Sequence, residues 1–221
     1  MMLVAILTRT RKTLQCRTMN KKEIQMKTLG VLLFDQFELL DVAGPVEMFA
    51  YLLEEIQIVF VAEEQKLIKS AQCLSVMTDV SLDHAPAIDY LFVPGGMGTR
   101  TEVNNPKLIS WIKTRAEQAE LVLGVCTGAA LLARAGVLDH RKATSNKLAF
   151  DWVMTQGPHT DWIRRARWVD DGKVITSSGV AAGTDMSLYV IGRLFGEAIR
   201  DALIQKTEYI YHQDPHLDPF A

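Results

Sequence analysis

The chain has 221 residues, of which 48% are hydrophobic and 23% are charged, a composition that suits one globular domain with a continuous core. Its formal net charge of −2 argues against a nucleic-acid or membrane-surface partner, and no apolar run is long enough to span a membrane. Three cysteines without a CxxC pair suit neither a disulfide framework nor a metal site, so we expect a soluble, cytoplasmic protein.

Residues 1–27 form a basic extension with seven lysines and arginines and one glutamate. A secretory signal is disfavoured because the apolar residues of the extension precede its charges, whereas an organelle transit peptide remains open because the segment is rich in Arg and Thr and poor in acids. We favour an extension that is disordered or not native, with the true start at Met19 or Met26. The domain is expected over residues 28–212, followed by a C-terminal tail over residues 213–221.

Short apolar runs alternate with amphipathic segments along the domain. In chain order, we expect strands or helices as follows: a strand at 28–34, a helix at 41–53, a strand at 56–62, short strands at 66–84, a strand at 90–93, a helix at 105–118, a strand at 121–125, helices at 127–135 and 146–156, a hairpin at 167–176 and mostly helix at 185–211. This alternation predicts a single doubly wound α/β domain, flavodoxin-like, with a mostly parallel sheet and helices on both faces. Ligands bind such sheets at the carboxyl ends of the strands.

An acidic residue follows the first strand. Asp41 lies in the otherwise apolar stretch FELLDVAGP, and a buried charge is costly unless it is paired or protonated. We therefore predict a catalytic acid or base at Asp41. The alternative is a helix N-cap, since aspartate is favoured there and Pro45 follows closely. Glu38 is the rival acid in the same loop, and we expect it to be solvated.

A glycine pair follows the strand at 90–93, in the stretch VPGGMG. Glycines at Gly95 and Gly96 allow the backbone to approach a ligand, and their amides can form an oxyanion hole with the amide of Thr127. The alternative is a tight turn without a chemical role.

A cysteine separates the strand at 121–125 from the next helix, in the stretch LVLGVCTGAALL. A nucleophile on such a strained turn needs small neighbours, and Gly124 and Gly128 flank Cys126 on either side. The helix amino terminus is expected to lower the thiol pKa from about 8.5 toward neutrality or below. We predict that the sulfur is ionised at neutral pH and faces an accessible hollow beside Asp41. The alternative is an inert structural cysteine.

The remaining cysteines and the histidines carry no comparable signal. Cys16 and Cys73 lack the small-residue frame and are expected to be incidental. No histidine directly follows Cys126, which does not support a Cys–His dyad. The histidines all fall in loops, turns or the tail: His84, His140, His159, His212 and His216.

The sequence resembles the ThiJ/PfpI superfamily, which shares its fold with class I glutamine amidotransferases. The matching stretches cover nearly all of residues 28–200: GVLLFDQFELLDVAGPVEMF, DYLFVPGGMG, LVLGVCTGAALLARAGVLDHRKATSNKLAF and GKVITSSGVAAGTDMSLYVIGRLFG. The CTG sequence, with LDVAGP upstream, resembles the isonitrile hydratase branch, which converts an isonitrile and water into an N-substituted formamide. The resemblance implies catalytic Asp41, Cys126 and Thr127, oxyanion amides at Gly96 and Thr127, no metal or organic cofactor, a small-molecule substrate and a homodimer.

Departures from the family pattern leave other functions open. The isonitrile hydratase branch commonly has a histidine in the segment that reads ATSN here, at residues 143–146, and its absence bears on the substrate. A glutaminase triad is disfavoured because residues 178–185 contain no histidine. Two alternatives remain: glyoxalase- or deglycase-like activity on reactive carbonyls, and redox or stress sensing through oxidation of Cys126. Residues 195–221 are too few for the helix-turn-helix module of a regulatory branch, so we expect no direct DNA binding.

Overall fold

The computed structural model describes residues 26–221. The predicted basic extension therefore lies outside the described residues except for its last two positions, as do Cys16 and the alternative start at Met19. None of the helices in residues 26–221 combines the length and the apolar character that crossing a bilayer requires.

Seven strands of the described chain form the main sheet, in the order β10-β11-β7-β6-β1-β2-β5. Neighbouring strands are parallel except for β10 and β11, which form an antiparallel hairpin. Two further pairs, β3–β4 and β8–β9, form small sheets of their own. The bounds are β1 (Lys27–Leu32), β2 (Ile56–Ala62), β3 (Leu67–Lys69), β4 (Ser75–Met77), β5 (Val80–Ser81), β6 (Tyr90–Val93), β7 (Leu121–Val125), β8 (Lys142–Ala143), β9 (Asp161–Trp162), β10 (Trp168–Asp171) and β11 (Val174–Ser177).

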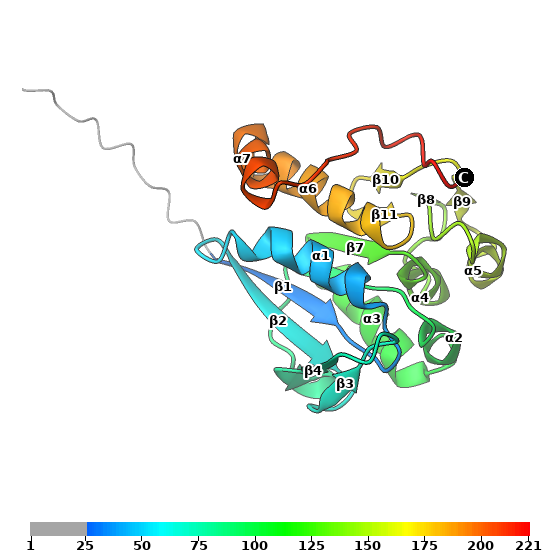
Figure 1. The fold of residues 1–221 in the computed structure, drawn as a ribbon. Coiled ribbons are helices and arrows are strands. Elements are labelled where there is room, and N and C mark those ends of the chain that lie inside the picture. The colour runs from blue at the N-terminus through cyan, green and yellow to red at the C-terminus, as the bar shows by residue number, and fades with distance from the viewer. Residues whose placement is uncertain (1–25) are drawn as a thin grey trace, which may run out of the picture.

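Helices cover both faces of this sheet (Figure 1). Helix α1 packs against α6, and α3 packs against α4 on the opposite face. Strands β6 and β7 are consequently buried along their whole length, which explains their uninterrupted apolar sequences. The predicted doubly wound α/β fold is confirmed. The bounds are α1 (Leu39–Ala50), α2 (Thr99–Glu102), α3 (Pro106–Gln118), α4 (Gly128–Arg134), α5 (Phe150–Gln156), α6 (Ala181–Phe195) and α7 (Glu197–Thr207), with a short 3₁₀ turn at Leu82–His84.

Most predicted elements are confirmed, but one predicted helix begins later than expected and another helical region is divided in two. The predicted hairpin at 167–176 is β10–β11, and it turns at Gly172 with φ 78°. Helix α5 begins only at Phe150 because Asn146 is used in a turn, where its Oδ1 accepts the amide of Ala149 at 3.0 Å. The helical region expected at 185–211 is divided into α6 and α7 at Gly196, which has φ 100°.

The loops after β1 and β6 are joined at the carboxyl edge of the sheet. Phe37 forms an isolated antiparallel bridge with Gly96, and the amide of Glu38 donates to the carbonyl of Gly95 at 2.9 Å. The turn after β7 and the loop after β11 open at the same edge because these strands run parallel to β6. The fold therefore gathers the three sequence motifs at one place, as parallel strands require.

Candidate active site

Cys126 lies on a strained turn between β7 and α4. Its φ of 55° places a non-glycine residue in the left-handed region, which costs about 1–2 kcal/mol. Neighbouring groups hold this conformation. The amide of Cys126 donates to the carbonyls of Ser177 and Ser178, both at 3.2 Å, and Ser145 Oγ donates to the Cys126 carbonyl at 2.7 Å. The prediction of a strained strand-to-helix turn at Cys126 is confirmed.

The first turn of α4 packs directly on the backbone that follows β6. A Cβ atom at Gly128 would lie 2.3 Å from the carbonyl oxygen of Val93 and 2.6 Å from that of Pro94. Backbone atoms cannot move away as a flexible side chain can, so this position requires glycine. At Gly124 the atom nearest to the added Cβ would be the end of the flexible Leu132 side chain, at 2.6 Å. Of the two supporting glycines, Gly128 is thus the one that the turn needs.

Asp41 is fully buried in the first turn of α1, at 0% exposure. Its Oδ2 accepts the amide of Gly95 at 2.8 Å, and its Oδ1 accepts the amide of Val180 at 3.1 Å. The N-cap of α1 is Glu38, so the interpretation of Asp41 as an N-cap is wrong. Glu38 is half-buried rather than fully solvated.

Burial raises the pKa of both reactive groups. It raises the pKa of Asp41 from 3.8 to about 7, although the amide of Gly95 opposes this rise. It also raises the pKa of the Cys126 thiol well above its ordinary value, and the charge of Asp41 adds to the effect. The prediction of an ionised sulfur in an accessible hollow is wrong, because the raised pKa keeps the thiol protonated at neutral pH and Cys126 is only 5% exposed. The amide and hydroxyl of Thr127 favour the thiolate but are outweighed.

The pair formed by Cys126 and Asp41 therefore retains a proton near neutral pH. The pKa of Asp41 is about 7 and burial holds the pKa of the thiol higher, so the site contains a neutral thiol beside a carboxyl group in equilibrium with its ionised form. Such a pair can transfer one proton within the site without help from solvent.

Thr127 connects the glycine pair to the thiol turn. Its Oγ1 accepts the amide of Gly96 at 2.9 Å and the hydroxyl of Thr99 at 3.1 Å. A Cβ atom at Gly95 would lie 2.5 Å from the amide nitrogen of Thr127 and 2.9 Å from Asp41 Oδ2. The structure thus differs from the predicted oxyanion site, because the amides of Gly95 and Gly96 donate to side chains. The amide of Thr127 interacts with the sulfur of Cys126, so it is the backbone donor that remains directed at the reactive group.

Sequence reasoning missed the contribution of the loop after β11. Val180 supplies an amide to Asp41, and Ser177 and Ser178 supply carbonyls to Cys126. These are backbone roles, and side-chain identity gives no signal for them. In the same loop, a Cβ atom added at Gly179 would lie 2.2 Å from the side chain of Asn146. The 143–146 segment therefore borders the site even though it contains no histidine.

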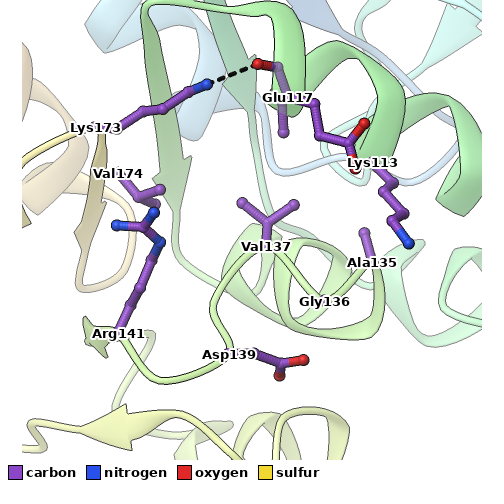
Figure 2. Close-up of a pocket in the computed structure, with 10 residues that line it drawn as sticks. Lys113, Glu117, Ala135, Gly136, Val137, Asp139, Arg141, Lys173 and Val174 are labelled. Atoms are coloured by element: carbon purple, nitrogen blue, oxygen red, sulfur yellow. Dashed lines mark hydrogen bonds between the residues drawn. The ribbon is translucent and has the colours of Figure 1, made fainter.

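A separate cavity of about 400 Å³ lies at the opposite end of the sheet (Figure 2). It is lined by Val137, Arg141, Lys173 and Val174, among others. Val174 begins β11, whereas the Cys126 turn contacts Ser177 at the other end of the same strand. This cavity is therefore distinct from the candidate active site.

A doubly wound α/β fold with a cysteine on a strained strand-to-helix turn defines the class of α/β protein to which this chain belongs. The family model described as "DJ-1/PfpI family" matches residues 27–193, and the chain belongs to this family.

The relatives of this chain have different activities. The chain is 31% identical to the isonitrile hydratase of Pseudomonas putida over 183 residues, which are 82% of this chain and 78% of that protein. It is 28% identical to the HTH-type transcriptional regulator GbdR of Pseudomonas aeruginosa over 188 residues, which are 83% of this chain but only 51% of the regulator. The crystal structure of a ThiJ/PfpI family protein from Pseudomonas syringae matches with a TM-score of 0.78 at 26% identity, covering 85% of this chain and 77% of that one.

Proposed function

We propose that this protein is a cysteine-dependent hydratase that adds water to an isonitrile and releases an N-substituted formamide. The observation that carries the proposal is the buried pair of Cys126 and Asp41, which retains a proton at neutral pH. The similarity to an isonitrile hydratase supports the same chemistry.

In the first step, the sulfur of Cys126 bonds to the terminal carbon of the isonitrile. Asp41 takes the thiol proton as the S–C bond forms and delivers it to the same carbon. The product is a thioimidate, R–N=CH–S, attached to Cys126, and no atom is lost. This addition brings one nucleophile and one proton to the same carbon. Cys126 supplies the nucleophile, and the proton is the one that Cys126 shares with Asp41. A pKa of about 7 at Asp41 suits transfer in both directions.

In the second step, water adds to the thioimidate carbon. Asp41 accepts one proton from the water, and the other water proton passes to the nitrogen as the carbon becomes tetrahedral, which leaves an oxyanion on that carbon. The amide of Thr127 would stabilise the negative charge that develops beside the sulfur. The C–S bond then breaks, the formamide leaves, and Asp41 returns a proton to the thiolate of Cys126.

The low exposure of Cys126 favours an isonitrile over bulkier substrates. Only 5% of the residue is accessible, so a substrate must present a slender reactive end. The carbon of an isonitrile is a terminal atom on a linear group, and it can approach a sulfur that a glycated protein side chain cannot reach. This argument weighs against the deglycase-like alternative.

The raised thiol pKa weighs against redox sensing. Peroxide oxidises the thiolate, and the neutral thiol of Cys126 is a poor target. We expect intact-mass analysis after mild peroxide treatment to show little oxidation of Cys126.

The direct test is to incubate the purified protein with cyclohexyl isonitrile at pH 7 and to measure the formamide by chromatography. We expect turnover by the wild type and by the Cys73→Ala control, whose cysteine is exposed and outside the site. Cys126→Ala should lose activity, and Asp41→Asn should lose about 100-fold or more. A turnover number unaffected by Cys126→Ala would exclude this mechanism.

A further inference from the structure

The C-terminal segment, residues 213–221, contains no helix or strand (Figure 1), yet it is bound to the start of β10. The carbonyl of Pro215 accepts the amides of Arg167 at 2.8 Å and Trp168 at 3.3 Å. The amide of Asp218 donates to the carbonyl of Arg165 at 2.8 Å. The segment is therefore attached through its backbone to the stretch that precedes β10.

Asp218 is the buried residue of this segment, with an exposure of 2%. Its Oδ1 accepts the amide of Phe220 at 2.9 Å, whereas its Oδ2 is buried without a hydrogen-bond partner and lies 3.7 Å from Nη1 of Arg167. Lys147 adds a second positive charge nearby. A carboxylate is buried in an irregular segment only where cations compensate its charge, so Asp218 depends on these two residues.

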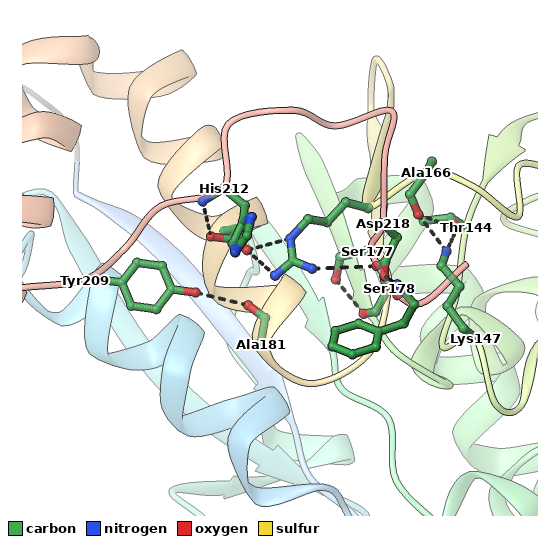
Figure 3. A network of polar contacts seen from close by, with 12 residues as sticks. Thr144, Lys147, Ala166, Ser177, Ser178, Ala181, Tyr209, His212 and Asp218 are labelled. Carbon is green, nitrogen blue, oxygen red and sulfur yellow. Dashed lines mark hydrogen bonds and ion pairs between the residues drawn. The ribbon is translucent and has the colours of Figure 1, made fainter.

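Arg167 joins the segment to helix α6. Its side chain is buried, and Nε and Nη2 donate to Oδ2 of Asp185 at 2.7 and 2.5 Å. The planar guanidinium thus contacts Asp185 on one side and Asp218 on the other, an arrangement that a lysine cannot reproduce. Figure 3 shows the aspartate of the tail beside this network.

Arg167 also reaches the candidate active site through its backbone. Its carbonyl accepts the amide of Ser178 at 2.7 Å. The carbonyl of Ser178 in turn accepts the amide of Cys126, and Val180, two residues further, donates to Asp41. One residue therefore holds both ends of this loop, through Ser178 at its start and through Asp185 in the first turns of α6.

We propose that Asp218 and Arg167 are positioning residues of the Cys126–Asp41 site. The carboxylate of Asp218 holds Arg167, and Arg167 holds the loop that presents the amide of Val180 to Asp41. The inference rests on the proposed function only for its kinetic readout, because the state of Cys126 can be measured without a substrate.

The test compares two identical changes in the full chain. Asp218→Asn places a donor against Arg167, while the control Asp214→Asn alters an exposed residue of the same segment, whose Oδ1 accepts the amide of His216. The readout is the rate of alkylation of Cys126 by iodoacetamide between pH 6 and 10, measured by peptide mass spectrometry.

We expect Asp218→Asn to loosen the loop and withdraw the amide of Val180 from Asp41. Asp41 would then keep its proton to higher pH and repel the thiolate less, so alkylation at pH 8 should accelerate by about threefold or more. Asp214→Asn should match the wild type. Arg167→Lys, which keeps the charge but cannot bridge two acids, should shift the profile in the same direction and serves if Asp218→Asn does not fold.

The kinetic readout is the formation of formamide from cyclohexyl isonitrile. We expect Asp218→Asn and Arg167→Lys to lower kcat for this reaction and to leave KM unchanged. A folded variant with lower thermal stability but the wild-type alkylation profile would overturn the proposal. If the profile shifts while the wild type makes no formamide, the positioning role stands and the hydratase function fails.

Discussion

The amide of Val180 binds Oδ1 of Asp41 at 3.1 Å, although the two residues are 139 positions apart in the sequence. Val180 has φ 49° and ψ −100°, a conformation that β-branched residues rarely adopt. The loop therefore stores strain at the point where it contacts the buried acid, as functional loops often do.

Replacing Val180 with glycine should separate stability from activity. We expect Val180→Gly to raise the free energy of unfolding by up to about 1 kcal/mol, because glycine adopts this backbone without strain. Isonitrile turnover should fall, because a glycine at this position leaves the amide free to move away from Asp41. Urea denaturation measures the first effect, and Val180→Ala, which keeps a Cβ atom, should show no gain. A destabilised Val180→Gly would contradict the strain argument.

Asp41 should make the protein less stable as the pH rises. Its pKa of about 7 in the folded state lies above 3.8, so the folded state binds more protons than the unfolded state between these values. Its contribution to stability is full below pH 4 and is lost as the pH rises through 7. We expect the Tm of Asp41→Asn, relative to the wild type, to be higher at pH 8 than at pH 5. A difference in Tm between the two proteins that is equal at pH 5 and pH 8 would contradict the raised pKa of Asp41.

Adding one methyl group at Gly95 should disrupt the site. The new Cβ atom would lie 2.5 Å from the amide nitrogen of Thr127 and 2.9 Å from Asp41 Oδ2. We expect Gly95→Ala to cost about 1–3 kcal/mol in unfolding free energy and to abolish isonitrile turnover. Gly192→Ala, where the nearest atom is 3.3 Å away on the flexible Arg200 side chain, should stay within about 1 kcal/mol of the wild type. Equal stability of the two variants would argue against the close approach at Gly95.

The strain at Cys126 should be visible in inactive variants. Because its φ is 55°, we expect Cys126→Gly to be more stable than Cys126→Ala by about 1 kcal/mol, although both lack the thiol. Paired urea titrations give this difference directly. If Cys126→Ala proves the more stable variant, the turn is not strained.

The sequence predicted those features of the fold and the site that depend on the type and spacing of neighbouring residues. Four apolar runs predicted β1, β2, β6 and β7, and the single cysteine between a strand and a helix predicted the turn at Cys126. Asp41 was predicted from an acid in an apolar stretch, and its burial is confirmed. These features follow from side-chain type and spacing, which the sequence states directly.

The features that the sequence did not predict depend on contacts between residues that are far apart in the chain. The pKa of Cys126 moves upward instead of downward because burial and Asp41 outweigh the start of a helix that is only seven residues long. The positions of Val180 and Ser178 depend on how β11 lies beside β7, and no local pattern encodes that contact. The C-terminal segment likewise gave no signal, because it is bound through backbone hydrogen bonds and through the contact of Asp218 with Arg167, 51 positions earlier in the sequence.

The attachment of Pro215 to the start of β10 has a further consequence for the behaviour of the protein at high concentration. Strand β10 is an outermost strand of the main sheet, and free amides on such a strand can recruit strands from other molecules. The carbonyl of Pro215 occupies the amides of Arg167 and Trp168, and proline offers no amide of its own to continue the pairing. Residues 213–221 thus block the pairing of a further strand at the start of β10.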